Sequence, residues 1–458
     1  MLYCQNRDKR LLGFGRKCRN KPDSMNTYLV NNVTIVNPDH IFAADVLIRG
    51  KVVESIASPN TLTVNSDVII DGTGQYLIPS GVDPHVHLNL PTPAGPSCDN
   101  FELGGRAAIA GGTGALIDFV TPARGESLID AFLKRKKESE SCPIPVKLHV
   151  GVTWWSKSVE EEITTLVNDY GVKSFKIYLA YRETIGLSFE ELTDAMKCIQ
   201  KNSAVVAIHA EEGDKIKQLR QEFVSQGNTA PRYHALTRPA ETEYNAVKKV
   251  IDIVRDTQCT TYLVHMSTAE SVAFIREAKN EGLPLFAETC PQYLLLDDSV
   301  YSKPEPDVFA YIISPPIRTK VDTDALWEGL ADETIDCVST DHCPFTLAQK
   351  LAGKDDFTKI PNGAGGIKHR MSLLFAYGVL QKRISLEQWV RLTSTNAAKI
   401  FGFEHFGKIE TGLPANLVLW QPEGVDHIGV SNSLSNANIG IYNNFEIAGY
   451  SSTIIQNK

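Results

Sequence analysis

Residues 83–90 read Asp83-Pro84-His85-Val86-His87-Leu88-Asn89-Leu90, and this stretch is the strongest indication of the fold. Side chains alternate between the two sides of a strand, so two histidines spaced i, i+2 lie on one face. The apolar run at 76–79 precedes them, which indicates a buried strand leading to the pair. Two imidazoles on one face are half of the ligands of a typical zinc site. The stretch therefore predicts a strand with a metal site at its end; a merely packed histidine pair is the alternative.

Short apolar runs that carry a metal-binding residue recur further along the chain. Barrels of parallel strands build their active sites at the carboxyl ends of the strands. Four such runs follow the histidine pair: 174–180 with Lys176, 205–211 with His209, 261–265 with His265, and 335–341 ending on Asp341. Three further apolar runs carry no such residue, at 115–120, 146–152 and 283–288. With helix-length segments between them, these runs predict an α/β fold, a (β/α)8 TIM-like barrel.

Nine motifs in series resemble those of the cyclic amidohydrolases, and most closely the dihydropyrimidinases and D-hydantoinases. The resemblance runs from about Asn31 to the end of the chain. The motifs are DPHVHL, SFKIYLAY, IHAEEGD, YHALTRP, LVHMSTAESV, ETCPQYL, SPPIR, STDHCPF and IPNG.

This resemblance implies two zinc ions per chain, bridged by an N6-carboxylated Lys176. His85, His87, Lys176 and Asp341 would hold the more buried ion, and Lys176, His209 and His265 the more exposed one. Metal-bound water has a pKa near 7, which suits amide hydrolysis at neutral pH. An amine held in an apolar strand tends to be neutral, so Lys176 could capture carbon dioxide as an anionic carbamate. A lysine that extends its amine to solvent from a strand end is the alternative.

The resemblance also implies the catalytic roles. Asp341 would be both metal ligand and general base, taking a proton from the metal-bridging hydroxide and passing it to the leaving nitrogen; a helix N-cap is its alternative role. Tyr181 would stabilise the tetrahedral oxyanion. Main-chain groups of Ser314 and Asn362 would bind the ring amide. The implied reaction is hydrolysis of dihydropyrimidines or 5-substituted hydantoins to N-carbamoyl amino acids.

Three other functions compete with this one. A dihydroorotase has an arginine directly after its histidine pair, whereas this chain has Leu88 and Asn89 there. An allantoinase is the nearer alternative, although IPNG, ETCPQYL and SFKIYLAY favour the hydantoinase group. A non-catalytic scaffold or signalling homologue would have lost metal ligands, and all six positions here carry competent residues.

The chain of 458 residues is long enough for a barrel and a smaller domain. We expect a basic, disordered tail at 1–26, with Met25 as an alternative start to the extended one that we favour. The first part of a β-sandwich should occupy 27–80, with strands at 28–36, 46–56 and 68–71. The barrel should occupy 81–404, and the second part of the sandwich 405–458.

Charge and composition narrow the partners and the compartment. A net charge of −8 argues against general nucleic-acid binding. Nine scattered cysteines without CxxC pairs fit a reducing cytoplasm. No apolar run approaches the length of a membrane span. The resemblance implies a small cyclic imide as substrate and a homo-oligomer, a dimer or tetramer, although the family pattern continues beyond Lys458 with a segment that often supports oligomers.

Overall fold

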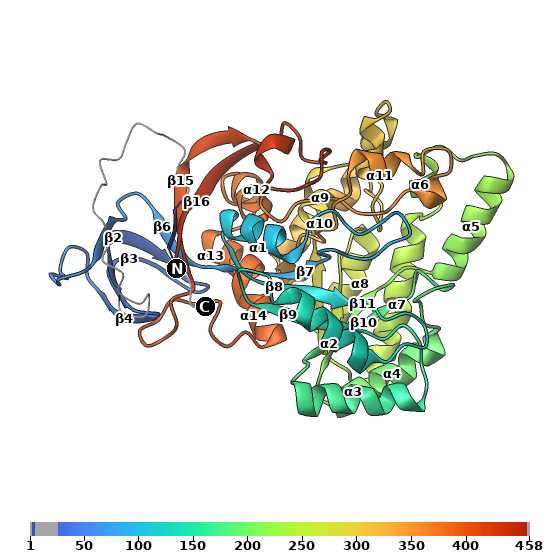
Figure 1. The fold of residues 1–458 in the computed structure, drawn as a ribbon, viewed down its shortest axis with the longest axis horizontal. Helices are drawn as coiled ribbons and strands as arrows, with labels where there is room; N and C mark the ends of the chain where they lie inside the picture. The colour runs from blue at the N-terminus through green and yellow to red at the C-terminus, as the bar shows by residue number, and fades with distance from the viewer. Residues whose placement is uncertain (1, 5–25, 456–458) are drawn as a thin grey trace.

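A computed structural model describes residues 2–4 and 26–455, and it contains the predicted parallel barrel (Figure 1). Eight strands form one sheet in sequence order, each parallel to its neighbours. The chain returns to the first strand at His342, where Val86 bridges it and the His87 N–H donates to its carbonyl at 2.8 Å. The barrel is thus nearly closed. Its strands are β7 (Gly81–Val86), β8 (Thr113–Val120), β9 (Val146–Gly151), β10 (Ser174–Tyr178), β11 (Val205–His209), β12 (Thr261–Leu263), β13 (Leu285–Thr289) and β14 (Cys337–Val338).

Helices alternate with these strands and cover the outside of the barrel (Figure 1). Several begin after a serine or threonine whose side chain accepts a backbone N–H, which satisfies a donor at the helix start: Ser127, Ser156, Ser188 and Thr268. The helices are α1 (Phe101–Ala110), α2 (Leu128–Ser139), α3 (Lys157–Tyr170), α4 (Phe189–Lys201), α5 (Gly213–Ser225), α6 (Tyr233–Leu236), α7 (Ala240–Thr257), α8 (Ala269–Asn280), α9 (Pro291–Leu295), α10 (Lys320–Ala331), α11 (Leu347–Leu351), α12 (Arg370–Leu374), α13 (Leu386–Val390) and α14 (Asn396–Phe401).

The alternation of side chains along each strand produces two apolar layers. Val206 and Ile208 of β11 belong to the core shared with the surrounding helices. Val205 and Ala207 belong to a second cluster, which also contains Phe401 of α14. Helix α14 therefore packs against inward-facing residues of the barrel, and the other end of the barrel carries the polar residues described below.

A second, mixed sheet combines both ends of the chain, as predicted, and lies beside the barrel (Figure 1). Its strand order is β1-β16-β15-β6-β2-β3-β4, and β5 pairs with β2. The strand that feeds the barrel, β6, pairs with β15 and β2 in this sheet before the chain enters β7. The strands are β1 (Leu2–Cys4), β2 (Thr27–Val36), β3 (Ile41–Arg49), β4 (Val52–Ala57), β5 (Val68–Asp71), β6 (Tyr76–Pro79), β15 (Leu417–His427) and β16 (Glu446–Ile455).

Two details differ from the sequence interpretation. The single strand predicted at 46–56 is wrong: it is a hairpin of β3 and β4, because the chain reverses at Gly50, whose φ of 63° favours glycine. Residues 2–4, inside the predicted tail, pair with β16, and the rest of that tail up to residue 25 lies outside the described residues. The domain limits remain a proposal.

Within residues 2–4 and 26–455, we find no helix with the length and apolar character that a membrane crossing requires.

Candidate active site

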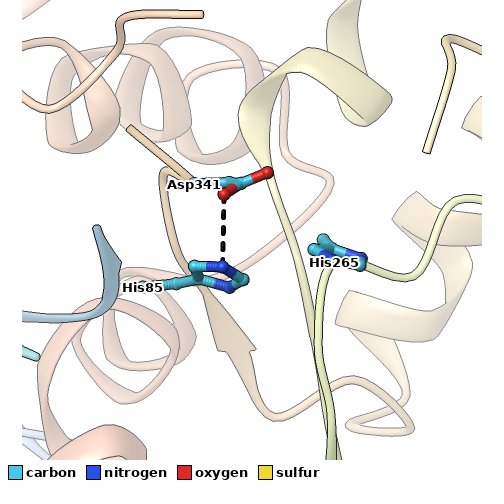
Figure 2. Close-up of side chains that lie close together, drawn as sticks. All are labelled: His85, His265 and Asp341. Carbon is cyan, nitrogen blue, oxygen red and sulfur yellow. Dashed lines mark ion pairs between the residues drawn. The ribbon is translucent and has the colours of Figure 1, made fainter. Parts of the chain in front are cut away.

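Three predicted ligands converge where β7 and β14 end. His85 lies in β7, His87 directly follows it, and their Nε2 atoms are 3.1 Å apart. Oδ1 of Asp341 is 3.2 Å from each of these nitrogens. Figure 2 shows Asp341 beside His85, with His265 nearby on a separate loop, the one that follows β12. The ligand atoms of His85, His265 and Asp341 all lie within 4.8 Å of one another, which is a spacing that can hold a metal ion.

His209 and His265 form the second part of the site. His209 is the last residue of β11, His265 follows β12, and their ring centroids are 4.5 Å apart. The Nε2 atom of His209 pairs with Glu211 at 2.7 Å, so Nδ1 is the ring nitrogen with which His209 could bind a metal ion. The structure thus brings the two predicted halves of the metal site together.

Lys176 lies inside this group and differs from Lys350, the other fully buried lysine of the described residues. Each is 1 % exposed, and burial lowers the pKa of each to about 7. Lys350 Nζ donates to the carbonyls of Ile312 and Gly363 at 2.8 and 2.9 Å. Lys176 Nζ has no hydrogen-bond partner among the described residues. The alternative that Lys176 extends its amine to solvent is therefore wrong. A buried amine without a hydrogen-bond partner is costly, which is compatible with a role in binding a ligand.

The unpartnered atoms fit a metal centre. Within the described part of the chain, His87 Nδ1 and His265 Nδ1 are buried without a hydrogen-bond partner, as is Lys176 Nζ. Buried polar atoms are normally paired, so these three in one site fit a bound metal ion as their partner. Imidazoles, a carboxylate and a neutral amine are donors that suit zinc.

The charge of Asp341 is set by its neighbours. Burial by itself raises the pKa of this carboxyl, but the imidazoles of His85 and His87 outweigh it and hold the pKa well below its usual value. Burial also lowers the pKa of His87, to about 4. For His85, burial is outweighed by Glu288 and Asp341, which raise its pKa to about 9. Asp341 is thus an anion at neutral pH, as a ligand or a proton acceptor must be.

Two of the ligands follow strands that end earlier than predicted. β12 ends at Leu263 and β14 at Val338, so His265 and Asp341 lie in the following loops. Their φ angles are 43° and 49°, in the left-handed region that non-glycine residues rarely adopt. Such backbone strain is concentrated at functional sites. The N-cap role for Asp341 is wrong, because the next helix, α11, has Thr346 as its cap.

The three predicted substrate residues also meet. The ring of Tyr181 lies 5.5 Å from that of His209, which places it at the edge of the histidine group. Burial raises the pKa of Tyr181, against the opposing effects of Arg238 and of a hydrogen bond with Ser314. Asn362 Nδ2 donates to Ser314 Oγ at 3.0 Å, and Asn362 Oδ1 is buried without a partner among the described residues. These side chains come from three loops that are far apart in sequence.

Sequence reasoning missed the residues that orient the ligands. Glu288 accepts from His85 Nδ1 at 2.5 Å and from the hydroxyl of Tyr262 at 2.8 Å. Glu211 pairs with His209 and, at 2.6 Å, with buried Arg238. Acids that hold the second nitrogen of a metal-binding histidine fix its orientation. The signal was available in part: Glu211 follows His209 at i+2, and Glu288 lies near the end of a strand that carried no ligand.

Comparison with known proteins agrees with this geometry. A sequence profile of the amidohydrolase family matches residues 76–450. The chain belongs to the amidohydrolase family. It is 35% identical over 438 residues to a dihydropyrimidinase of Dictyostelium discoideum, covering 94% of this chain and 87% of that protein. It is 38% identical over 399 residues to a D-hydantoinase of Geobacillus stearothermophilus, covering 86% and 84%.

Solved structures place this amidohydrolase in the same group. The crystal structure of a dihydropyrimidinase from Brevibacillus agri superposes with a TM-score of 0.91, at 37% identity and with 94% of each chain covered. An L-hydantoinase from Arthrobacter aurescens gives 0.85 at 25% identity. The chain is therefore an enzyme of the dihydropyrimidinase and hydantoinase type, a cyclic amidohydrolase, as the motifs predicted.

Proposed function

We propose that this amidohydrolase opens the cyclic amide of dihydropyrimidines and 5-substituted hydantoins to give N-carbamoyl amino acids. One observation carries the proposal: a buried, unpartnered Lys176 amine lies among the converging His85, His87 and Asp341. The names of the relatives support the substrate class, because a dihydropyrimidinase and a D-hydantoinase each align with most of the chain.

The proposed cofactor is a pair of zinc ions per chain, with Lys176 carboxylated between them. His85, His87 and Asp341 would share one ion with Lys176, and His209 and His265 would share the other. When bound, the ions would supply a water molecule of lowered pKa and polarise the scissile carbonyl.

The chain's own residues would do the remaining work. Asp341, ionised and beside the histidine pair, would accept the proton of the attacking water and deliver it to the leaving nitrogen. The Tyr181 hydroxyl, whose pKa burial raises above its ordinary value, would be protonated at neutral pH and would donate to the developing oxyanion. Main-chain groups of Ser314 and Asn362 would hold the ring amide. The Lys350 amine supports those two loops through hydrogen bonds to the carbonyls of Ile312 and Gly363.

A substrate panel on the zinc-loaded enzyme tests the proposal. We expect kcat/KM to be highest for dihydrouracil and 5-substituted hydantoins. The main-chain groups of Ser314 and Asn362 would contact the imide that these substrates share and not the ring substituent. Dihydroorotate should be poor, since no arginine follows the histidine pair, where this chain has Leu88 and Asn89, and its ring carboxylate would lose water without a partner. Allantoin is the second candidate in the panel. Dihydroorotate or allantoin as the best substrate would contradict the assignment.

Replacing Tyr181 with phenylalanine should lower kcat by about a hundredfold or more, the usual effect of losing one oxyanion donor. KM should change much less, because the hydroxyl acts mainly on the transition state. Steady-state kinetics with dihydrouracil would measure both. A Tyr178→Phe variant is the matched control, since that buried tyrosine flanks Lys176 without an assigned catalytic role. Unchanged kcat in Tyr181→Phe would remove Tyr181 from the mechanism.

A further inference from the structure

A cavity of about 330 Å³ lies beside Tyr181, between the loop after β10 and helix α5. Three cations line it, Arg182, Lys217 and Arg220, against one acid, Glu183. None of these residues has a place in the site described above. The cavity has an excess of positive charge next to the residue proposed to contact the substrate.

The three cations differ in how they are neutralised. Lys217 pairs with Glu183 at 2.7 Å, and Arg182 lies 3.6 Å from Asp214. Arg220 is half-buried, and Nη2 donates to the Thr358 carbonyl at 3.0 Å. Among the described residues, no carboxylate lies within ion-pair distance of the Arg220 guanidinium. Asp356 and Glu183 act on its charge only from beyond that distance, so it is the least neutralised of the three cations.

The surroundings of Arg220 also disfavour its positive charge. Burial and the neighbouring guanidinium of Arg238 lower the pKa of Arg220. An anion bound here would relieve that repulsion. A guanidinium suits a carboxylate because its planar N–H groups can donate in pairs.

Two of the residues that line the cavity relate it to the proposed substrate position. Tyr181 lines the cavity and also meets Ser314 in the site. Thr358, at the other end, lies four residues before Asn362 in the same connecting segment. A substituent that leaves the bound ring past Tyr181 would therefore enter a basic cavity.

We propose that this cavity is a subsite for a carboxylate at the end of the ring substituent, with Arg220 as its main contact. The inference rests on the proposed function and adds a preference, among the 5-substituted hydantoins, for those with an acidic side arm, such as 5-(2-carboxyethyl)hydantoin. Dihydroorotate is not such a substrate, because its carboxylate is attached directly to the ring and has no arm to pass Tyr181.

The test compares 5-(2-carboxyethyl)hydantoin with its neutral amide, 5-(2-carbamoylethyl)hydantoin, which has nearly the same shape. In the zinc-loaded enzyme, kcat/KM should favour the acid by roughly tenfold, the scale of one charged hydrogen bond. Arg220→Gln should remove most of this preference while leaving the amide nearly unchanged. Lys215→Gln removes the same charge from α5 outside the cavity and should keep the preference. The preference should also weaken as salt increases.

Binding separates this inference from the proposed function. Calorimetry of both compounds on Asp341→Asn, whose turnover should be strongly slowed, measures the acid preference in binding even if the ring is never opened. Equal affinity for acid and amide would overturn the subsite, as would equal losses in Arg220→Gln and Lys215→Gln. Failure of hydrolysis for every ring, with the acid preference in binding intact, would overturn the proposed function and leave the subsite supported.

Discussion

Replacing Lys176 with alanine should abolish measurable turnover and remove much of the bound metal. The wild-type chain should contain two divalent ions by elemental analysis after zinc-supplemented expression, and the variant well under one. The reason is that Lys176 Nζ is a buried amine with no hydrogen-bond partner in the described part of the chain, so its role is to bind rather than to pack. Short carboxylic acids such as acetate should restore part of the activity, because they can supply the missing oxygens.

Lys350→Ala is the matched control for this experiment. Lys350 is equally buried, but its amine is satisfied by the carbonyls of Ile312 and Gly363. Its loss should lower the melting temperature, because two buried carbonyls lose their donor, while the metal content stays at the wild-type level. A Lys176→Ala variant that keeps two ions per chain would disprove the bridging role.

Replacing Asp341 with asparagine should lower kcat by roughly two to four orders of magnitude, the usual scale for losing a general base. The amide keeps an oxygen that can reach the histidine pair but cannot accept the proton. Metal content should therefore fall only modestly. Kinetics and elemental analysis of the same preparation separate the role of base from that of ligand.

Asp336→Asn is the matched control, because it also removes a carboxylate. Asp336 directly precedes β14, whereas Asp341 lies in the loop after it. Asp336 pairs with Lys279 at 2.7 Å and has no proposed role in catalysis or metal binding. Its kcat should stay within about twofold of wild type, a change on the scale of an ordinary substitution away from the chemistry. Near-normal kcat in Asp341→Asn would mean that another group accepts the proton.

The barrel could be predicted from sequence, and the candidate metal-binding residues proposed from it, because their signals are local. An i, i+2 histidine pair and polar residues at the ends of apolar runs follow from the two-residue period of a strand. The limits of the runs were less predictable. His265 and Asp341 continue apolar runs, yet the backbone leaves the sheet before each of them. Their positive φ angles depend on surrounding contacts, which a local pattern does not contain.

The contacts between distant segments could not be predicted. Glu288 lies 203 residues from His85, and Arg238 lies 27 from Glu211, so no local pattern joins them. The roles of Lys176 and Lys350 differ for the same reason. Both are lysines with a pKa lowered by burial, and only the folded chain shows which amine has partners.

The sequence by itself determined the family, the alternating barrel and the set of residue types able to bind metal and move a proton. These features depend on the alternation of apolar and polar residues along the chain and on the chemistry of each side chain. Both are properties of the sequence before it folds. Only the tertiary structure decided which side chains meet, that the Lys176 amine has no hydrogen-bond partner among the described residues, and that Arg220 lines a cavity beside Tyr181 with none of their carboxylates within ion-pair distance. Those features depend on burial and on distances across the closed sheet, which exist only after the strands have come together.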